Sequence, residues 1–110
     1  MKHITAIEDL YTLIQDETML VVYFSNDACN VCKVLKPKIA ELLTDEFPKV
    51  AFAYVDTGKN PETAGQFRVF SIPTIDIYVD GKEQTRFSRN VTLFEFEAAI
   101  ERPYKILFSE

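Results

Sequence analysis

Residues 21–33, VVYFSNDACNVCK, place an apolar run, a polar turn and a pair of cysteines directly after one another. Six consecutive apolar residues, from Met19 to Phe24, predict a strand at Met19–Ser25 that is covered on both faces of a sheet. The two cysteines that follow are spaced C-x-x-C and open a predicted helix. The pattern therefore predicts a dithiol at the point where a buried strand ends and a helix begins.

The length and composition of the chain exclude several classes of binding partner. A chain of 110 residues suits one domain, which buries about two thirds of the surface that its unfolded form exposes. The net charge is −5 and no basic cluster occurs, which argues against nucleic acid and against an anionic membrane as partners. With three glycines, no Gly-rich phosphate loop can be drawn. Small molecules and proteins remain as partners.

The apolar segments also bear on location. Glu8 and Asp9 precede any apolar segment of signal-peptide length, and the longest apolar run is too short to span a membrane. We therefore expect a soluble, cytoplasmic protein. In a reducing cytosol, two cysteines this close together are more often catalytic, redox-sensing or metal-binding than a structural crosslink.

Apolar periodicity predicts four helices and four strands in the order α-β-α-β-α-β-β-α. They are a helix at 5–17, a strand at 19–25, a helix after the cysteines, a strand at 50–55, a helix at 60–68, strands at 74–79 and 83–88, and a helix from 92. Helices between strands imply parallel neighbours, and Asp80-Gly81 predicts an antiparallel hairpin. The expected fold class is α/β, a mixed central sheet with helices on both faces. No linker or repeat occurs, so residues 1–110 are predicted to form a single domain.

Capping and proline signals predict where the helices begin and end. Residues 5–8 and 92–95 match the capping box, and Asn60-Pro61 suits an N-cap followed by proline in the first helical position. Pro37 predicts a kink in the helix after the dithiol. Pro103 is expected to end or bend the last helix, with the apolar tail beyond it packed against the domain.

The spacing of the cysteines suits nucleophilic chemistry. A thiolate is the nucleophile, and Cys29 at a helix N-terminus faces unpaired N–H groups and the positive end of the helix dipole, which favour the charged form. Cys32 lies on the same side of the first turn, near enough to form a disulfide. Attack by Cys29 on a substrate disulfide gives a mixed disulfide that Cys32 resolves, and no organic cofactor is needed.

Three hypotheses for the dithiol stay open. The first is a thiol-disulfide oxidoreductase that acts on protein disulfides and takes electrons from a reductase or another dithiol donor. The second is a redox-sensing or binding module with low turnover. The third is a metal site shared by two copies of the chain, because two cysteines and His3 fall short of the four ligands of an intramolecular zinc site.

The C-x-x-C, Pro37 in the following helix and the segment Ser71-Ile72-Pro73-Thr74 together resemble the thioredoxin family, over nearly the whole chain up to Ile100. The resemblance implies the thioredoxin fold and a cis peptide bond before Pro73, which faces the dithiol. It also implies that the backbone of Ile72 contacts an extended substrate. The remaining substrate-binding positions that it implies are Ala28, Thr57 and Arg89.

Several positions depart from the family pattern. A typical thioredoxin has Trp-Cys-Gly-Pro-Cys-Lys where residues 28–33 are ACNVCK. The family's buried acid is Tyr23 here, and the lysine that accompanies it aligns with Tyr54. A phenol is a poor general base near neutrality, so we interpret both tyrosines as core aromatics whose hydroxyls can pair. We interpret Asp27 as a turn or capping residue, with a role as proton acceptor as the alternative.

The rim of the site is bulkier and more polar than in the family, because Ser71 and Arg89 take the places of two glycines, with Ser88 and Asn90 beside them. Asp76 is a separate departure, since an acid within an apolar strand costs free energy if it is buried without a partner. We expect it to bind water or a hydroxyl such as that of Thr85. A carboxylate coupled to the dithiol is the alternative.

Overall fold

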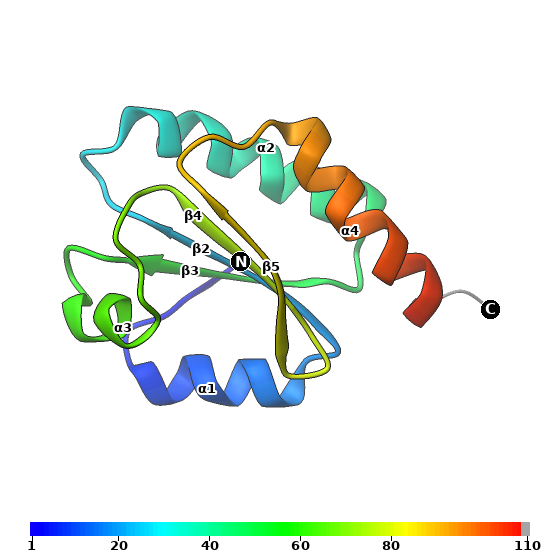
Figure 1. The fold of residues 1–110 in the computed structure, drawn as a ribbon, viewed down its shortest axis with the longest axis horizontal. Coiled ribbons are helices and arrows are strands. Elements are labelled where there is room, and N and C mark those ends of the chain that lie inside the picture. The colour runs from blue at the N-terminus through cyan, green and yellow to red at the C-terminus, as the bar shows by residue number, and fades with distance from the viewer. Residues whose placement is uncertain (109–110) are drawn as a thin grey trace.

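In the computed structural model, which describes residues 1–108, a five-stranded sheet separates two layers of helices (Figure 1). The elements are β1 (Lys2–His3), α1 (Ile7–Asp16), β2 (Met19–Ser25), α2 (Asn30–Glu46), β3 (Ala51–Asp56), α3 (Pro61–Gln66), β4 (Thr74–Val79), β5 (Lys82–Ser88) and α4 (Leu93–Phe108). Helices α2 and α4 cover one face, and α1 and α3 cover the other. The predicted fold class is confirmed.

The strand order is β1-β3-β2-β4-β5, with β1, β3 and β2 parallel to one another. Strand β4 runs antiparallel to β2 although α3 separates β3 from β4, so the expectation of parallel neighbours holds only for the first three strands. Strand β1 was not predicted, because two residues are too few to show a periodicity. Its pairing with β3 extends the sheet by one strand.

Strand β2 lies at the centre of the sheet, and all seven of its residues are buried. Its side chains alternate between two cores: Met19, Val21 and Tyr23 pack under α2 and α4, and Leu20, Val22 and Phe24 pack over α1. A strand with both faces covered must be apolar throughout, as its sequence indicated. The dithiol therefore follows the most deeply buried strand of the protein.

The helix ends follow the capping signals only in part. The box at residues 92–95 is confirmed, because the N–H of Glu95 donates to Thr92 Oγ1, which donates to Glu95 Oε1, both at 3.1 Å. The box at residues 5–8 is wrong, because Ala6 is the N-cap of α1 and makes no side-chain bond. Pairing of the Ile4 N–H with the Tyr54 carbonyl, at 2.8 Å, keeps the chain extended past β1 and delays the helix.

Asn60 precedes α3 as predicted, but its side chain makes no capping bond and donates instead to the carbonyl of Asp56, at 3.0 Å. Pro103 does not end the last helix, since α4 continues to Phe108, and the alternative of a bend at Pro103 stays a prediction. Tyr104 explains the continuation, because its ring packs against Phe47 and Phe108 with centroids 5.1 and 4.9 Å away. Leu107 and Phe108 also pack against the core as expected, whereas Ile106 is 71% exposed, so the expectation is wrong for that residue.

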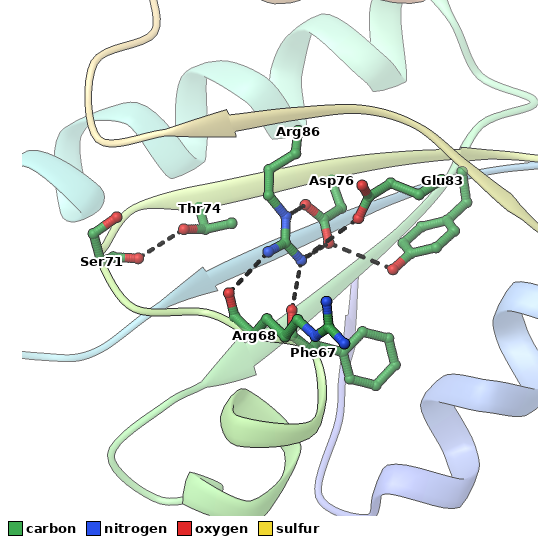
Figure 2. A network of polar contacts seen from close by, with 8 residues as sticks. Phe67, Arg68, Ser71, Thr74, Asp76, Glu83 and Arg86 are labelled. Carbon is green, nitrogen blue, oxygen red and sulfur yellow. Dashed lines mark hydrogen bonds and ion pairs between the residues drawn. The ribbon is translucent and has the colours of Figure 1, made fainter.

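Asp76 is completely buried on β4, and its partner differs from the prediction. Arg86 on β5 donates from Nε to Oδ1 at 2.7 Å and from Nη2 to Oδ2 at 2.8 Å (Figure 2). A hydroxyl also bonds the carboxylate, as expected, but it is that of Tyr78, which donates to Oδ2 at 3.4 Å. Thr85 as the partner is wrong because the β4–β5 register shifts between Ile77 and Tyr78. Without that shift Thr85 would lie opposite Asp76, whereas the shift brings Arg86 there.

Candidate active site

The two cysteines lie at the start of α2. Cys29 is the N-cap residue, Cys32 lies in the first turn, and a disulfide joins them with 5.3 Å between their Cα atoms. The Sγ of Cys29 accepts a hydrogen bond of 3.2 Å from the backbone N–H of Cys32. Cys29 is partly buried, whereas Cys32 is only 1% exposed. Another molecule can therefore reach the sulfur of Cys29 more readily than that of Cys32.

The turn before the dithiol is held by Asn26. Its side-chain Oδ1 accepts the N–H of Ala28 at 2.9 Å, and its carbonyl accepts the N–H of Cys29 at 3.2 Å. Asp27 lies in the same turn, as interpreted, but its exposed carboxylate makes no capping bond and lies 3.8 Å from the ammonium of Lys59. The polar residues of this stretch thus bend the chain so that Cys29 caps the helix.

The segment at residues 71–74 lies at the same edge of the sheet. Thr74 pairs with Phe24 at the carboxyl end of β2, which brings the buried Pro73 to the edge where the dithiol stands. The peptide bond between Ile72 and Pro73 is cis, the isomer expected for this segment. The Thr74 hydroxyl donates to the Ser71 carbonyl at 2.7 Å and closes the turn (Figure 2).

Arg86 on β5 and Arg89, the residue that follows β5, anchor this segment. The backbone N–H of Arg89 donates to the carbonyl of Pro73 at 2.8 Å. The guanidinium of Arg86 donates to the carbonyls of Phe67 and Arg68, at 2.7 and 2.9 Å, just after α3 (Figure 2). Both ends of the loop that carries Pro73 are therefore tied to β5 or to the residue that follows it.

Two tyrosines lie beneath the dithiol, and their hydroxyls have different partners. Tyr23 donates to the carbonyl of Cys32 at 3.0 Å, and Tyr54 accepts a bond of 3.0 Å from the Ser25 hydroxyl. Their rings stack with centroids 6.3 Å apart, so both are core aromatics, but the expected pairing of hydroxyls is wrong. Burial, and secondly the neighbouring Tyr54, raise the pKa of Tyr23 well above its ordinary value. Tyr23 is thus a neutral hydrogen-bond donor.

Comparison with known proteins shows which family has this sequence and fold. The thioredoxin family matches residues 3–102, nearly the whole chain. The chain belongs to the thioredoxin family. Thioredoxins are thiol-disulfide oxidoreductases, and the fold together with the Cys29–Cys32 pair makes this chain one.

Individual relatives agree with this assignment. Thioredoxin-like protein YdfQ of Bacillus subtilis is 27% identical over 113 residues, which cover 100% of both chains. Thioredoxin of Chlamydia muridarum is 40% identical over 68 residues, which cover 62% of this chain and 66% of that protein. The X-ray structure of Fasciola hepatica thioredoxin superposes with a TM-score of 0.74 at 37% identity, over 80% of this chain and 86% of that one.

Lys36 is a residue of this thioredoxin site that the sequence analysis missed. Its ammonium lies 3.7 Å from the centroid of the Tyr54 ring, a cation–π contact. A cavity of about 150 Å3 reaches Cys32 between these two side chains and Asp27. The signal was present, because Lys36 follows Cys32 by four residues and so lies above it on one helix face. A role for Asp27 as proton acceptor at this cavity stays a prediction.

The predicted substrate-binding residues around the dithiol differ in their exposure and in their hydrogen bonds. Ala28 is exposed beside Cys29. Thr57 directs its N–H and its hydroxyl to the Ser25 carbonyl, at 2.8 and 3.3 Å, so its polar groups bind the protein itself. Arg89 is exposed and lines a groove with Asn30, one of the two residues between the cysteines. Substrate contacts of all these residues stay predictions.

Phe70 is a second residue that the sequence analysis did not single out. Its side chain is 88% exposed, and it directly precedes the Ser71-Ile72-Pro73 segment. Exposed aromatic side chains are common anchors at protein interfaces. The available signal was a phenylalanine in the irregular stretch between α3 and β4.

Within residues 1–108, no helix is both long enough and apolar enough to cross a membrane. The same part of the chain contains no group of three or more metal-ligating side chains.

Proposed function

We propose that residues 1–110 act as one thioredoxin-like domain that reduces or exchanges protein disulfides, with Cys29 as nucleophile and Cys32 as resolving cysteine. The observation that carries the assignment of roles is the difference in burial of the two cysteine residues at the start of α2. The N-cap position also supports Cys29, because the backbone N–H groups of the first turn stabilise a thiolate there.

The proposed reaction has two steps. The Cys29 thiolate attacks one sulfur of the client disulfide, forms a mixed disulfide and releases the other client sulfur as a thiolate. The Cys32 thiolate then attacks the Cys29 sulfur and releases the second client thiolate. Two electrons pass from the dithiol to the client, which leaves the Cys29–Cys32 disulfide. A reductase or another dithiol donor restores the reduced state.

The client is proposed to lie extended along the edge that carries the dithiol. The proposed contacts with the client are the backbone of Ile72, which precedes the buried Pro73, and the residues Ala28, Thr57 and Arg89. A cytoplasmic location belongs to the same proposal, because a reducing compartment keeps the dithiol ready to attack. Cell fractionation tests the location.

Single cysteine variants test the roles. With a protein disulfide as substrate and a thiol reductant present, Cys29→Ser abolishes turnover. The pre-reduced Cys32→Ser variant, mixed with the same substrate without added reductant, accumulates a mixed disulfide that mass spectrometry detects. The two variants are matched controls for each other, because each removes one sulfur from the same turn. Full activity of Cys29→Ser, or a mixed disulfide on Cys32 alone, contradicts the assignment.

A redox-sensing or binding module with low turnover is the second candidate. The observation that favours it is the neutral phenol of Tyr23. The phenol donates to the backbone carbonyl of Cys32 and cannot accept the proton of the Cys32 thiol near neutrality. Rapid multiple turnover on several unrelated disulfide substrates, with reductant supplied, separates the candidates in favour of the oxidoreductase. Metal analysis of the reduced protein tests the remaining hypothesis of zinc shared by two copies.

A further inference from the structure

A groove of about 610 Å3 begins beside the dithiol and is lined by residues of α2 and of the loop that joins β5 to α4. The loop leads from β5 into α4, which lies with α2 on the same face of the sheet (Figure 1). Asn30 and Val31, the two residues between the cysteines, form its near end. Its walls are largely apolar, and Val31 and Val34 are 63% and 59% exposed. Apolar side chains left open to water beside a reactive sulfur indicate a surface that a partner covers.

The charges along the groove favour an anion. Lys38 of α2 and Arg89 of the loop both line it, and among residues 1–108 neither forms an ion pair. The one acidic residue of the groove, Glu95, accepts the Thr92 hydroxyl in the capping box of α4. A chain with a net charge of −5 therefore presents a surplus of positive charge at this place.

The backbone of Arg89 provides an independent indication. Its φ angle is 67°, in the left-handed region that glycine adopts freely and other residues rarely adopt. The bond from its N–H to the Pro73 carbonyl holds this conformation, and it uses main-chain atoms only. An arginine kept where glycine fits without strain points to a use for its side chain.

We propose that this groove binds the polypeptide next to the client's reactive cysteine, and that it selects segments carrying an apolar residue and an acidic residue. The inference rests on the proposed reduction of protein disulfides. The apolar residue packs on Val31 and Val34, and the carboxylate pairs with the Arg89 guanidinium, a geometry that permits two parallel hydrogen bonds. Arg89 is then the residue that determines specificity.

Three symmetric peptide disulfides test the proposal. Each peptide carries one cysteine and one leucine, and they differ at a single position that is Asp, Gln or Lys. Second-order rate constants with the reduced protein at low ionic strength are divided by those with dithiothreitol, which removes the intrinsic reactivity of each peptide. The Asp peptide is expected to react about tenfold faster than the Lys peptide on this scale, because close charges and steering both contribute.

Variants then locate the source of the preference. The ratio of Asp to Lys rates falls to about twofold or less in Arg89→Gly and inverts in Arg89→Glu. Arg102→Glu is the matched control, since it makes the same change of charge at an exposed position of α4 outside the groove and keeps the ratio near tenfold. Replacing the leucine of the peptide by serine is expected to lower the rate constant of the wild-type protein about threefold. The same change of peptide should have little effect on the rate constant of the Val34→Ser variant.

The outcomes separate this inference from the proposed function. If no peptide is reduced, the proposed function fails and this inference fails with it. If all three are reduced at equal normalised rates, or Arg102→Glu acts like Arg89→Glu, only the selectivity is overturned. A ratio unchanged between roughly 0.02 M and 0.5 M salt also overturns it, because screening weakens exposed charge pairs. A dimer of the reduced protein that Val34→Ser dissociates assigns the groove to a second copy and overturns the proposal.

Discussion

Replacing Arg86 by methionine is expected to destabilise the protein strongly. The change removes two bonds to the completely buried Asp76 and two bonds to the carbonyls of Phe67 and Arg68. Asp76 then keeps only the Tyr78 hydroxyl, at 3.4 Å. Breaking a buried ion pair from one side costs about 3–5 kcal/mol. Because the Arg86 side chain is 24% exposed and water can enter from that side, we expect about 3 kcal/mol.

Urea unfolding of the reduced protein measures the change in the free energy of unfolding. The double variant Asp76→Leu with Arg86→Met removes both charges and is expected to regain most of the loss, to within about 1 kcal/mol of the wild type. Lys105→Met is the control, because it breaks the exposed pair with Glu101 and should cost less than about 0.5 kcal/mol. A loss below about 1 kcal/mol for Arg86→Met would refute the reasoning that an unpaired buried carboxylate is costly.

Three further changes test single contacts. Tyr23→Phe removes the donor to the Cys32 carbonyl and should lower the free energy of unfolding by about 1 kcal/mol in urea, and an unchanged midpoint would show that this bond does not stabilise the fold. Thr92→Ala should cost about 1 kcal/mol through loss of the N-cap, and an equal loss in Thr92→Ser would contradict that cause. Phe70→Ser should raise KM for protein disulfides about fivefold more than KM for a small disulfide, and a parallel change in both would exclude an interface role.

The sequence predicted the centre of the fold well because its signals there are local. An unbroken apolar run needs cover on both faces, and this single requirement places β2 in the middle of the sheet and the dithiol at its end. The same holds for the Asp80-Gly81 hairpin, whose two residues have the positive φ angles of 50° and 81° that this turn requires. Apart from the end of α4, the bounds of the predicted elements are correct to within two residues.

Contacts that depend on tertiary geometry were not predictable in the same way. A shift of register between Ile77 and Tyr78 decides that Asp76 meets Arg86, and nothing in the local pattern of β5 marks the shift. Lys36 reaches Tyr54 only because α2 packs across the sheet. The separate partners of the Tyr23 and Tyr54 hydroxyls likewise depend on where Cys32 and Ser25 present their polar atoms.

The bond from the Arg89 N–H to the Pro73 carbonyl has a consequence for how the protein can diversify. Since only main-chain atoms form it, a change of the side chain at position 89 leaves the donor and the acceptor of this bond in place beside the dithiol, although the positive φ angle there favours glycine. The sulfur chemistry resides on α2 and is encoded elsewhere in the chain. If Arg89 selects clients as proposed, a single codon change at position 89 would redirect the protein toward other clients while the residues of the dithiol are inherited unchanged.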